Sequence, residues 1–216
     1  MNKADAINSR VVIVRNVFND YEIKQLSDLY ETIRKEETKR ALLRGPLTSD
    51  ENEFFDHPAL DGLRTTNHIS VFVHVNKRID NELPEILTKI VTLMRLIDEQ
   101  QKWNLLSSTP GANIRVMEFH EYSAGGSVAD PFHADGGSLV TSSVLLSDPA
   151  DFTGGEFSTM ELDKQTMNYH DDLKKGDAVV FVSEKWHSVE VVETGIRRSF
   201  VTELWPGPRC VEGRDS

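Results

Sequence analysis

Apolar residues in the first hundred positions recur at the spacing of amphipathic helices. Asn19 and Glu22 have the spacing of an N-terminal capping box, in which each side chain binds the backbone N–H of the other residue. The pattern predicts a helix that begins there and ends near Arg40. Its apolar positions are Ile23, Leu26, Tyr30 and Ile33.

A second helix is predicted to start around Asn81, with Pro84 tolerated in its first turn. Short apolar runs at Val11–Val14 and Ile69–Val75 indicate strands. The stretch from Gly45 to Asn67 has little periodicity and many turn-forming residues, so we expect a long loop there. The apolar positions of the second helix, which we expect to pack into the core, are Ile86, Leu87, Ile90, Leu93, Met94 and Ile97.

From Ala112 onward the pattern changes to short strands separated by turns, which predicts two sheets closed into a roll. The predicted fold class is therefore α+β: a double-stranded β-helix (jelly-roll) core with N-terminal helices packed on one sheet. We divide the chain into an N-terminal strand and helical support region (1–110), the jelly-roll core (111–206) and a loose polar tail (207–216). Residues 1–206 are expected to form one integrated domain.

The composition is that of a soluble globular protein. Of the 216 residues, 38% are hydrophobic and 27% charged, and no apolar run is long enough to span a bilayer. The N-terminus lacks the apolar core of a signal peptide, and the single cysteine, Cys210, cannot form an internal disulfide. These features predict a cytoplasmic protein with no membrane partner, and they leave the oligomeric state open.

The net charge argues against a nucleic-acid partner. The chain has 24 Lys and Arg against 35 Asp and Glu, a formal net charge of −11. An acidic protein repels a phosphate backbone unless it carries a local basic patch. The basic clusters visible here are only pairs, such as Lys174-Lys175, so we expect no binding to nucleic acid.

Two histidines and one carboxylate have the spacing of a metal site. His133 and Asp135 are two positions apart, so on an extended strand their side chains point to the same face. His187 follows about fifty residues later, after a run at Asp177–Val182 that is predicted to be a buried strand. Two imidazoles and one carboxylate can cap one face of an octahedral iron(II) and leave three positions open. Zinc could also occupy such a set of ligands.

Further motifs surround these residues. They are Tyr122-Ser123-Ala124-Gly125-Gly126, His133-Ala134-Asp135, Gly154-Gly155-Glu156-Phe157, Gly176-Asp177-Ala178-Val179-Val180-Phe181, His187-Ser188-Val189, Gly195-Ile196-Arg197-Arg198-Ser199 and Trp205. Through them the chain resembles, from about Ala112 to Trp205, the prolyl-4-hydroxylase-type branch of the iron(II)/2-oxoglutarate-dependent dioxygenases. The N-terminal part matches this family only in general layout.

The resemblance implies that His133, Asp135 and His187 are catalytic metal ligands. In related halogenases a small residue replaces the carboxylate and makes room for chloride, so Asp135 favours hydroxylation or desaturation. The implied cofactors are Fe(II) and O2, with 2-oxoglutarate as co-substrate and ascorbate as a possible addition.

The resemblance also implies that Arg197, ten residues after His187, binds the distal carboxylate of 2-oxoglutarate. A guanidinium can give a carboxylate two parallel hydrogen bonds. Strand alternation places Ser199 on the same face, as a further donor, and Arg198 on the opposite face. Tyr122 is a further candidate for binding the co-substrate, and its alternative role is that of a packed tyrosine at a strand end.

One position departs from the family pattern. Leu145 stands where many relatives carry a tyrosine or lysine that reaches the distal carboxylate, and Thr141 or Ser143 on the same face could substitute for it. Glu118 and His120 could bind substrate at the mouth of the roll, although a structural role is favoured for both.

The predicted function is an iron(II)- and 2-oxoglutarate-dependent dioxygenase that hydroxylates an unactivated C–H bond and releases succinate and carbon dioxide. Small size favours a small-molecule substrate, such as an amino acid or metabolite, over the alternative of a prolyl-type residue in a protein. A further alternative is a metal-binding roll without oxygenase activity, against which Arg197 argues because a plain metal site needs no such clamp. Nucleic-acid demethylation is disfavoured because Glu203 replaces the second arginine of that branch.

Overall fold

The computed structural model describes residues 10–44 and 67–213. The strands are β1 (Val11–Val14), β2 (His68–Phe72), β3 (Asn113–Ser123), β4 (Val140–Leu145), β5 (Phe152–Gly154), β6 (Phe157–Met160), β7 (Met167–Tyr169), β8 (Ala178–Val182), β9 (His187–Val189) and β10 (Val192–Trp205). The helices are α2 (Asp20–Arg44), α3 (Arg78–Glu82) and α4 (Pro84–Gln100), with 3-10 turns η3 (Val75–Lys77) and η4 (Pro149–Asp151).

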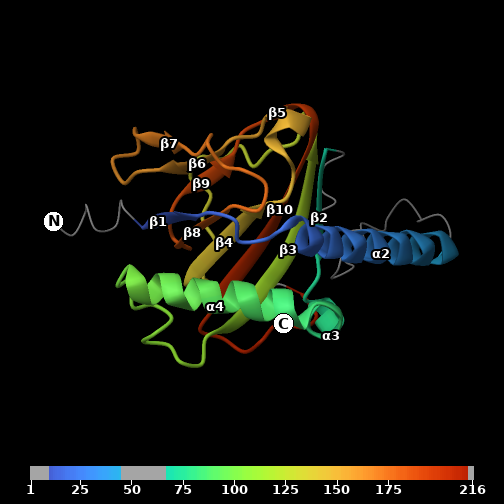
Figure 1. The fold of residues 1–216 in the computed structure, drawn as a ribbon, viewed down its shortest axis with the longest axis horizontal. Coiled ribbons are helices and arrows are strands. Elements are labelled where there is room, and N and C mark those ends of the chain that lie inside the picture. Colours follow the sequence, from blue (N-terminus) through green and yellow to red (C-terminus); the bar gives the residue numbers. More distant parts are fainter. Residues whose placement is uncertain (1–9, 45–66, 214–216) are drawn as a thin grey trace.

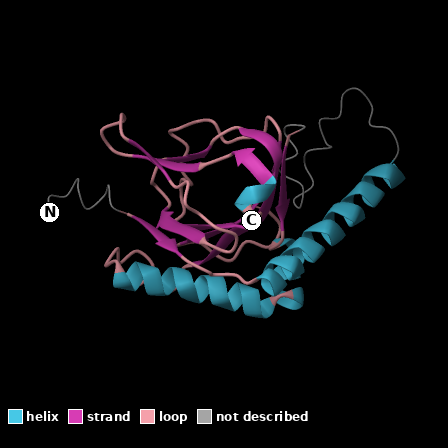
Figure 2. Cartoon of the chain, turned by 45° about the horizontal axis from the view of Figure 1, so that its top comes forward, coloured by secondary structure: helices cyan, strands magenta, loops and turns pink. Residues whose placement is uncertain are grey.

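The strands form two antiparallel sheets. The larger sheet has seven strands in the order β1-β8-β4-β10-β3-β2, with β5 paired to β10 beside this path, and the smaller sheet has the order β7-β6-β9. Figure 1 shows α2 and α4 along one side of the larger sheet, and Figure 2 shows both helices outside the roll. The predicted α+β class, a jelly roll with helices packed on one sheet, is confirmed.

One hydrophobic core lies between the helices and the outer face of the larger sheet. Tyr30 of α2 stacks on Phe119 of β3 with their ring centroids 4.2 Å apart, and Ile90 and Met94 of α4 are fully buried. Positions three or four apart on a helix and two apart on a strand return to one face, so the two patterns meet here. Burying each such side chain contributes about 1.5–3 kcal/mol, which holds the helices on the sheet.

A second, smaller core lies inside the roll. Tyr122, Leu145 and Phe181 from the larger sheet pack with Phe157 and Val189 from the smaller sheet. Apolar residues therefore fill part of the space between the sheets, and polar residues line the rest of it.

The helix predictions are correct in part. The capping box at the start of α2 is confirmed, because the Glu22 N–H donates to the Asn19 Oδ1 at 3.0 Å and the Asn19 N–H donates to the Glu22 carboxylate at 2.9 Å. The second helix is confirmed with Pro84 in its first turn, but it begins at Pro84, because Asn81 belongs to the separate short helix α3 and the two helices break at Leu83. Pro84 explains the break, because a proline disfavours helical geometry in the residue before it.

Two other expectations change at the edges of these elements. The strand expected over 69–75 ends at Phe72, and Val75 belongs to the turn η3. The loop expected over 45–67 lies outside the described residues except for Asn67.

The tail beyond Pro206 is docked on the roll as far as the structure describes it, which corrects the expectation of a loose segment. Cys210 is fully buried, and its N–H donates to the Ile114 carbonyl at 3.1 Å. The Asn76 N–H donates in turn to the Val211 carbonyl at 2.8 Å. Paired backbone groups of this kind hold a segment in place even when its sequence is polar. Among the described helices, none has the length and apolar character needed to cross a membrane.

Candidate metal centre

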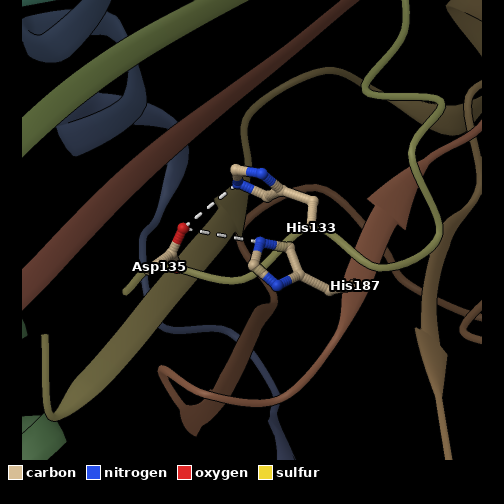
Figure 3. A group of neighbouring side chains, drawn as sticks. All are labelled: His133, Asp135 and His187. Carbon is tan, nitrogen blue, oxygen red and sulfur yellow. Dashed lines mark ion pairs between the residues drawn. The ribbon is translucent and has the colours of Figure 1, made fainter. Parts of the chain in front are cut away.

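His133, Asp135 and His187 bring one ligand atom each to within 4.8 Å of one another (Figure 3). The His133 Nε2 lies 3.3 Å from the Asp135 Oδ1, and the His187 Nε2 lies 3.8 Å from the same oxygen. Asp135 and His187 are buried, whereas His133 is exposed, so the set is open on one side. Two nitrogens and one oxygen suit iron(II) or zinc better than calcium, which prefers oxygen ligands alone.

The backbone around the triplet is held from both sides, although it is not a strand as expected. The His187 N–H donates to the His133 carbonyl at 2.9 Å, and the Asp135 N–H donates to the Ser183 carbonyl at 2.9 Å. The triplet lies in an irregular segment, and Gly137, two residues after Asp135, has a φ of +89°. The two side chains still reach the same side, because these bonds tie the segment to β9 and to the end of β8.

Two neighbouring groups orient the ligand atoms. The Thr141 hydroxyl donates to the Asp135 Oδ2 at 2.7 Å, which leaves Oδ1 facing the histidines. The His187 Nδ1 lies 2.9 Å from the Lys185 carbonyl, which can only accept, so the ring proton is on Nδ1 and the Nε2 lone pair is free to bind a metal. Thr141 was a candidate for the co-substrate, but in the structure its hydroxyl binds Asp135.

Electrostatics keep both buried ligands in the form that binds metal. Burial lowers the pKa of His187 despite the nearby charge of Asp135, so its imidazole is neutral. Burial acts to raise the pKa of Asp135, but hydrogen bonds with His133 and with the Thr141 hydroxyl act against it, and the pKa is held below its usual value. A neutral imidazole and an ionised carboxylate are the forms that a metal requires.

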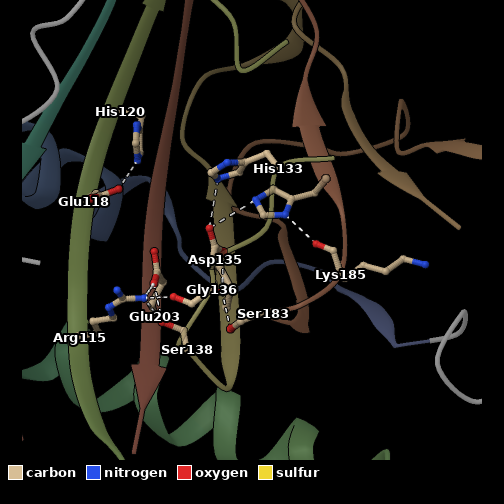
Figure 4. A network of polar contacts seen from close by, with 12 residues as sticks. Arg115, Glu118, His120, His133, Asp135, Gly136, Ser138, Ser183, Lys185 and Glu203 are labelled. Carbon is tan, nitrogen blue, oxygen red and sulfur yellow. Dashed lines mark hydrogen bonds and ion pairs between the residues drawn. The ribbon is translucent and has the colours of Figure 1, made fainter. Parts of the chain in front are cut away.

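A hydrogen-bonded network holds the turn that follows Asp135 (Figure 4). Arg115 on β3 donates to the Gly136 carbonyl at 2.5 Å and to the Ser138 hydroxyl at 3.3 Å. The Ser138 hydroxyl donates to the Glu203 carboxylate at 2.6 Å, and Arg115 lies 3.6 Å from the same carboxylate. Glu203, which stands where the demethylase branch has an arginine, therefore supports the backbone beside the metal ligand.

Arg197 is buried inside the roll, as strand alternation predicted. It is 3% exposed, its Nη1 donates to the Ser199 hydroxyl at 3.3 Å, and its guanidinium carbon lies 5.7 Å from the centre of the Tyr122 ring. Arg198 points to the opposite face, where its Nε donates to Glu121 at 2.8 Å. The three candidates for co-substrate binding thus lie together.

The charge of Arg197 is not paired within the described part of the chain. Burial lowers its pKa, but a guanidinium stays protonated in proteins. Among the described residues it forms no ion pair within 4.0 Å, and the exposed Glu156 acts on it only from a greater distance. The glycine motif makes room beside it, because a Cβ added to Gly155, whose φ is +69°, would lie 2.9 Å from the Arg197 Cδ. A buried cation without a carboxylate partner is unfavourable, so this place suits an anionic ligand.

A cavity of about 400 Å³ lies between the sheets and includes the metal triad in its walls. Glu118 and His120, which were expected at the mouth of the roll, line this cavity together with Tyr122 and Ser199. Its lining from β2, which includes Ser70, was not expected, because nothing in the sequence indicated that β2 pairs with β3. The Arg115 network was also missed, because it depends on the pairing of β3 with β10, which the sequence did not indicate.

In structure the chain is similar to solved 2OG-Fe(II) oxygenases. An oxidoreductase of that family from Burkholderia pseudomallei is 14% identical, with a TM-score of 0.57 over 100% of this chain and 95% of that one. The viral collagen prolyl hydroxylase of Paramecium bursaria Chlorella virus-1, solved with 2OG, is 15% identical, with a TM-score of 0.52 over 94% and 98%. A Trichoplax adhaerens prolyl hydroxylase, solved with a peptide fragment of the hypoxia inducible factor oxygen degradation domain, is 11% identical, with a TM-score of 0.54 over 94% and 87%.

At these identities the likeness establishes the fold: the chain has the jelly roll of the 2OG-Fe(II) oxygenases. Neither protein-family models nor curated protein sequences match the chain.

Proposed function

We propose that this protein is a prolyl-4-hydroxylase-like, iron(II)- and 2-oxoglutarate-dependent dioxygenase. It hydroxylates an unactivated C–H bond of a small molecule, such as an amino acid or metabolite, with release of succinate and carbon dioxide. The shared fold supports this proposal, because the similar structures belong to that class of enzyme.

The observation that carries the proposal is the pairing of two features in one roll. The triad offers two imidazoles and one carboxylate to a metal, and Arg197 is a buried cation without a described carboxylate partner. A metal site alone does not require a buried guanidinium, whereas a dicarboxylate that binds the metal at one end needs a cation at the other. This argues against the alternative of a metal-binding roll without oxygenase activity.

In the proposed site His133, Asp135 and His187 hold the iron, and Arg197 and Ser199 bind the distal carboxylate of the co-substrate. When bound, iron(II) with 2-oxoglutarate and O2 supplies the oxidising chemistry for C–H hydroxylation. The chain positions these groups and excludes water. Burial raises the pKa of Tyr122, so its hydroxyl keeps its proton and can donate a hydrogen bond to the co-substrate.

The test is an anaerobic titration of the metal-free protein with iron(II) and 2-oxoglutarate. We expect a weak visible charge-transfer band that forms only when both are present, and no band in His187→Ala. If no band forms but calorimetry still detects metal binding, the result would instead support a metal-binding roll without oxygenase activity.

A protein substrate remains the second candidate, because several similar structures are prolyl hydroxylases and one contains a peptide. The cavity favours the small molecule, since about 400 Å³ is near the lower end of small-ligand sites and must also hold the co-substrate. Succinate release, screened over amino acids, peptides and metabolites, separates the two. A cytoplasmic location also stays a prediction.

A further inference from the structure

A row of hydrogen-bonded polar side chains forms the cavity wall on β2 and β3. The His120 Nε2 lies 2.8 Å from the Glu118 Oε2, and the His68 Nε2 lies 2.9 Å from the His120 Nδ1. Glu118, His120 and Tyr122 alternate along β3 and all face the cavity. Register places Ser199 of β10 directly opposite His120, so this wall lies beside the proposed co-substrate site.

Both hydrogen bonds of this row can form with the two histidine rings uncharged. A carboxylate only accepts, so the His120 Nε2 donates to Glu118, and the His120 Nδ1 can accept from the His68 Nε2. Burial lowers the pKa of His68 to about 3, so His68 adds no positive charge at neutral pH. Glu118 is 3% exposed, and a carboxylate has acceptor capacity for a ligand in addition to its protein partners.

Ser70 gives an independent indication of a ligand. It lies between His68 and Phe72 on β2, it is 4% exposed, and it lines the cavity. Its Oγ is buried and has no hydrogen-bond partner within the described structure. A buried hydroxyl without a partner is unfavourable, and such exceptions often mark a missing ligand or water. Register pairs Ser70 with His120, so the hydroxyl belongs to the same wall.

We propose that Glu118, His120 and Ser70 form a substrate subsite that binds a primary ammonium group, so that the substrate is a small primary amine. An ammonium carries three donors and no acceptor, which matches the Glu118 carboxylate together with the unpartnered Ser70 hydroxyl, which register places opposite His120, two residues along β3. Arg197 carries the opposite charge, and register pairs it with Tyr122, four residues along β3 from Glu118. An amine and a dicarboxylate would therefore be sorted to these two places, since like charges repel and opposite charges attract.

This subsite would determine the substrate class of the proposed oxygenase, so the inference rests on the proposed function. The test uses calorimetry on anaerobic protein loaded with iron(II) and 2-oxoglutarate, with L-lysine, L-ornithine and 1,4-diaminobutane as probes. Each probe is compared with its derivative acetylated on every amine. We expect at least one amine to bind more than tenfold tighter than its acetylated form.

Three variants examine the residues. Glu118→Gln should weaken binding of the preferred amine about tenfold to a hundredfold, since hydrogen bonds to charged groups are the stronger ones. Ser70→Ala should weaken it about twofold to tenfold and leave the melting temperature unchanged or higher, because the hydroxyl has no protein partner to lose. Glu121→Gln is the control: Glu121 lies on the opposite face of β3, bound to Arg198, and should leave amine affinity unchanged.

The proposal is overturned if no amine outcompetes its acetylated form tenfold, or if both Glu118→Gln and Ser70→Ala retain amine affinity within twofold. Ser70→Ala keeps the test decisive even if Glu118→Gln does not fold. The charge-transfer band reports the co-substrate separately, and the calorimetry is repeated on metal-free protein. Amine binding without a band would therefore contradict the proposed function and leave the subsite standing.

Discussion

At the scale of single residues, orientation matters as much as identity. Thr141 and His187 show this, because the hydrogen bonds that they make decide which atoms of the metal site face inward. Arg197 shows it as well: it is one residue from Arg198, yet it lies in the roll while its neighbour binds Glu121 on the outer face. Both arginines were visible in the sequence, and strand alternation predicted correctly which one enters the roll.

Arg197→Ala should weaken 2-oxoglutarate binding. Truncating one partner of a buried charge pair costs about 2–5 kcal/mol, which at about 1.4 kcal/mol per tenfold is roughly thirtyfold to several thousandfold in affinity. Arg198→Ala is the control and should change the affinity by only a few-fold. The measurement is a 2-oxoglutarate titration followed by the charge-transfer band, with iron(II) affinity expected to be unchanged. A larger loss in Arg198→Ala would mean that the strand register is wrong by one residue.

Thr141→Val should weaken iron(II) binding about tenfold to a hundredfold, because it removes the hydrogen bond that orients Asp135. The matched control is Thr202→Val on the neighbouring strand. Thr202 is also fully buried, but its hydroxyl has no partner within the described structure, so this change should leave metal affinity unchanged and stability equal or higher. Calorimetric titration with iron(II) compares the two, and equal losses would exclude the orienting role of Thr141.

At the scale of elements, contacts between strands distant in sequence hold the site together. β1 pairs with β8, and β2 pairs with β3, so segments before residue 110 complete the sheet that carries the cavity. Asp177, just before β8, strengthens one of these junctions. Its carboxylate accepts from Arg15 at 2.8 Å and from the N–H groups of Asn16 and Lys174, each at 2.9 Å.

Asp177 should make the fold sensitive to acid. Burial acts to raise its pKa, but the Arg15 hydrogen bond and the two N–H groups outweigh it, so the folded-state pKa is below the unfolded value of about 3.9. The folded state then binds fewer protons than the unfolded state. This stabilisation is therefore present above about pH 4 and is lost as the pH falls through the folded pKa.

Asp177→Asn should consequently lower the free energy of unfolding at pH 7 by about 1–3 kcal/mol, with the difference from wild type shrinking below about pH 4. Urea unfolding at a series of pH values measures this. Asp171→Asn, at an exposed position, should stay within about 0.5 kcal/mol of wild type. A difference for Asp177→Asn that does not depend on pH would show that the carboxylate charge is not responsible.

At the scale of the whole molecule, metal binding should couple to stability, because the triad is assembled from segments about fifty residues apart. A ligand that binds only the folded state stabilises it by about 2.7 kcal/mol at a hundredfold excess over its Kd. We expect iron(II) to raise the melting temperature under anaerobic conditions and a chelator to reverse the rise. His187→Ala should abolish the shift and still fold, whereas His170→Ala should keep it. An equal shift in His187→Ala would place the metal elsewhere.

Much of this protein followed from local sequence pattern. The capping box at Asn19, the apolar stripe of α4, the buried run of β8 and the alternation at Arg197 each depend on residues a few positions apart. The His133-Asp135 spacing with a distant His187 also identified the candidate ligands, because few arrangements of two imidazoles and a carboxylate serve a metal.

Tertiary structure alone decided which other residues line the cavity, support the metal site and hold the C-terminal tail. Ser70 and His68 reach the cavity because β2 pairs with β3. Arg115 supports the turn after Asp135 because β3, which carries it, pairs with β10, which carries Glu203. Pro206 and the residues after it looked loose, yet Cys210 is buried against Ile114. Such contacts depend on strand register across long loops, and a shift of one residue in register would turn every one of these side chains to the other face.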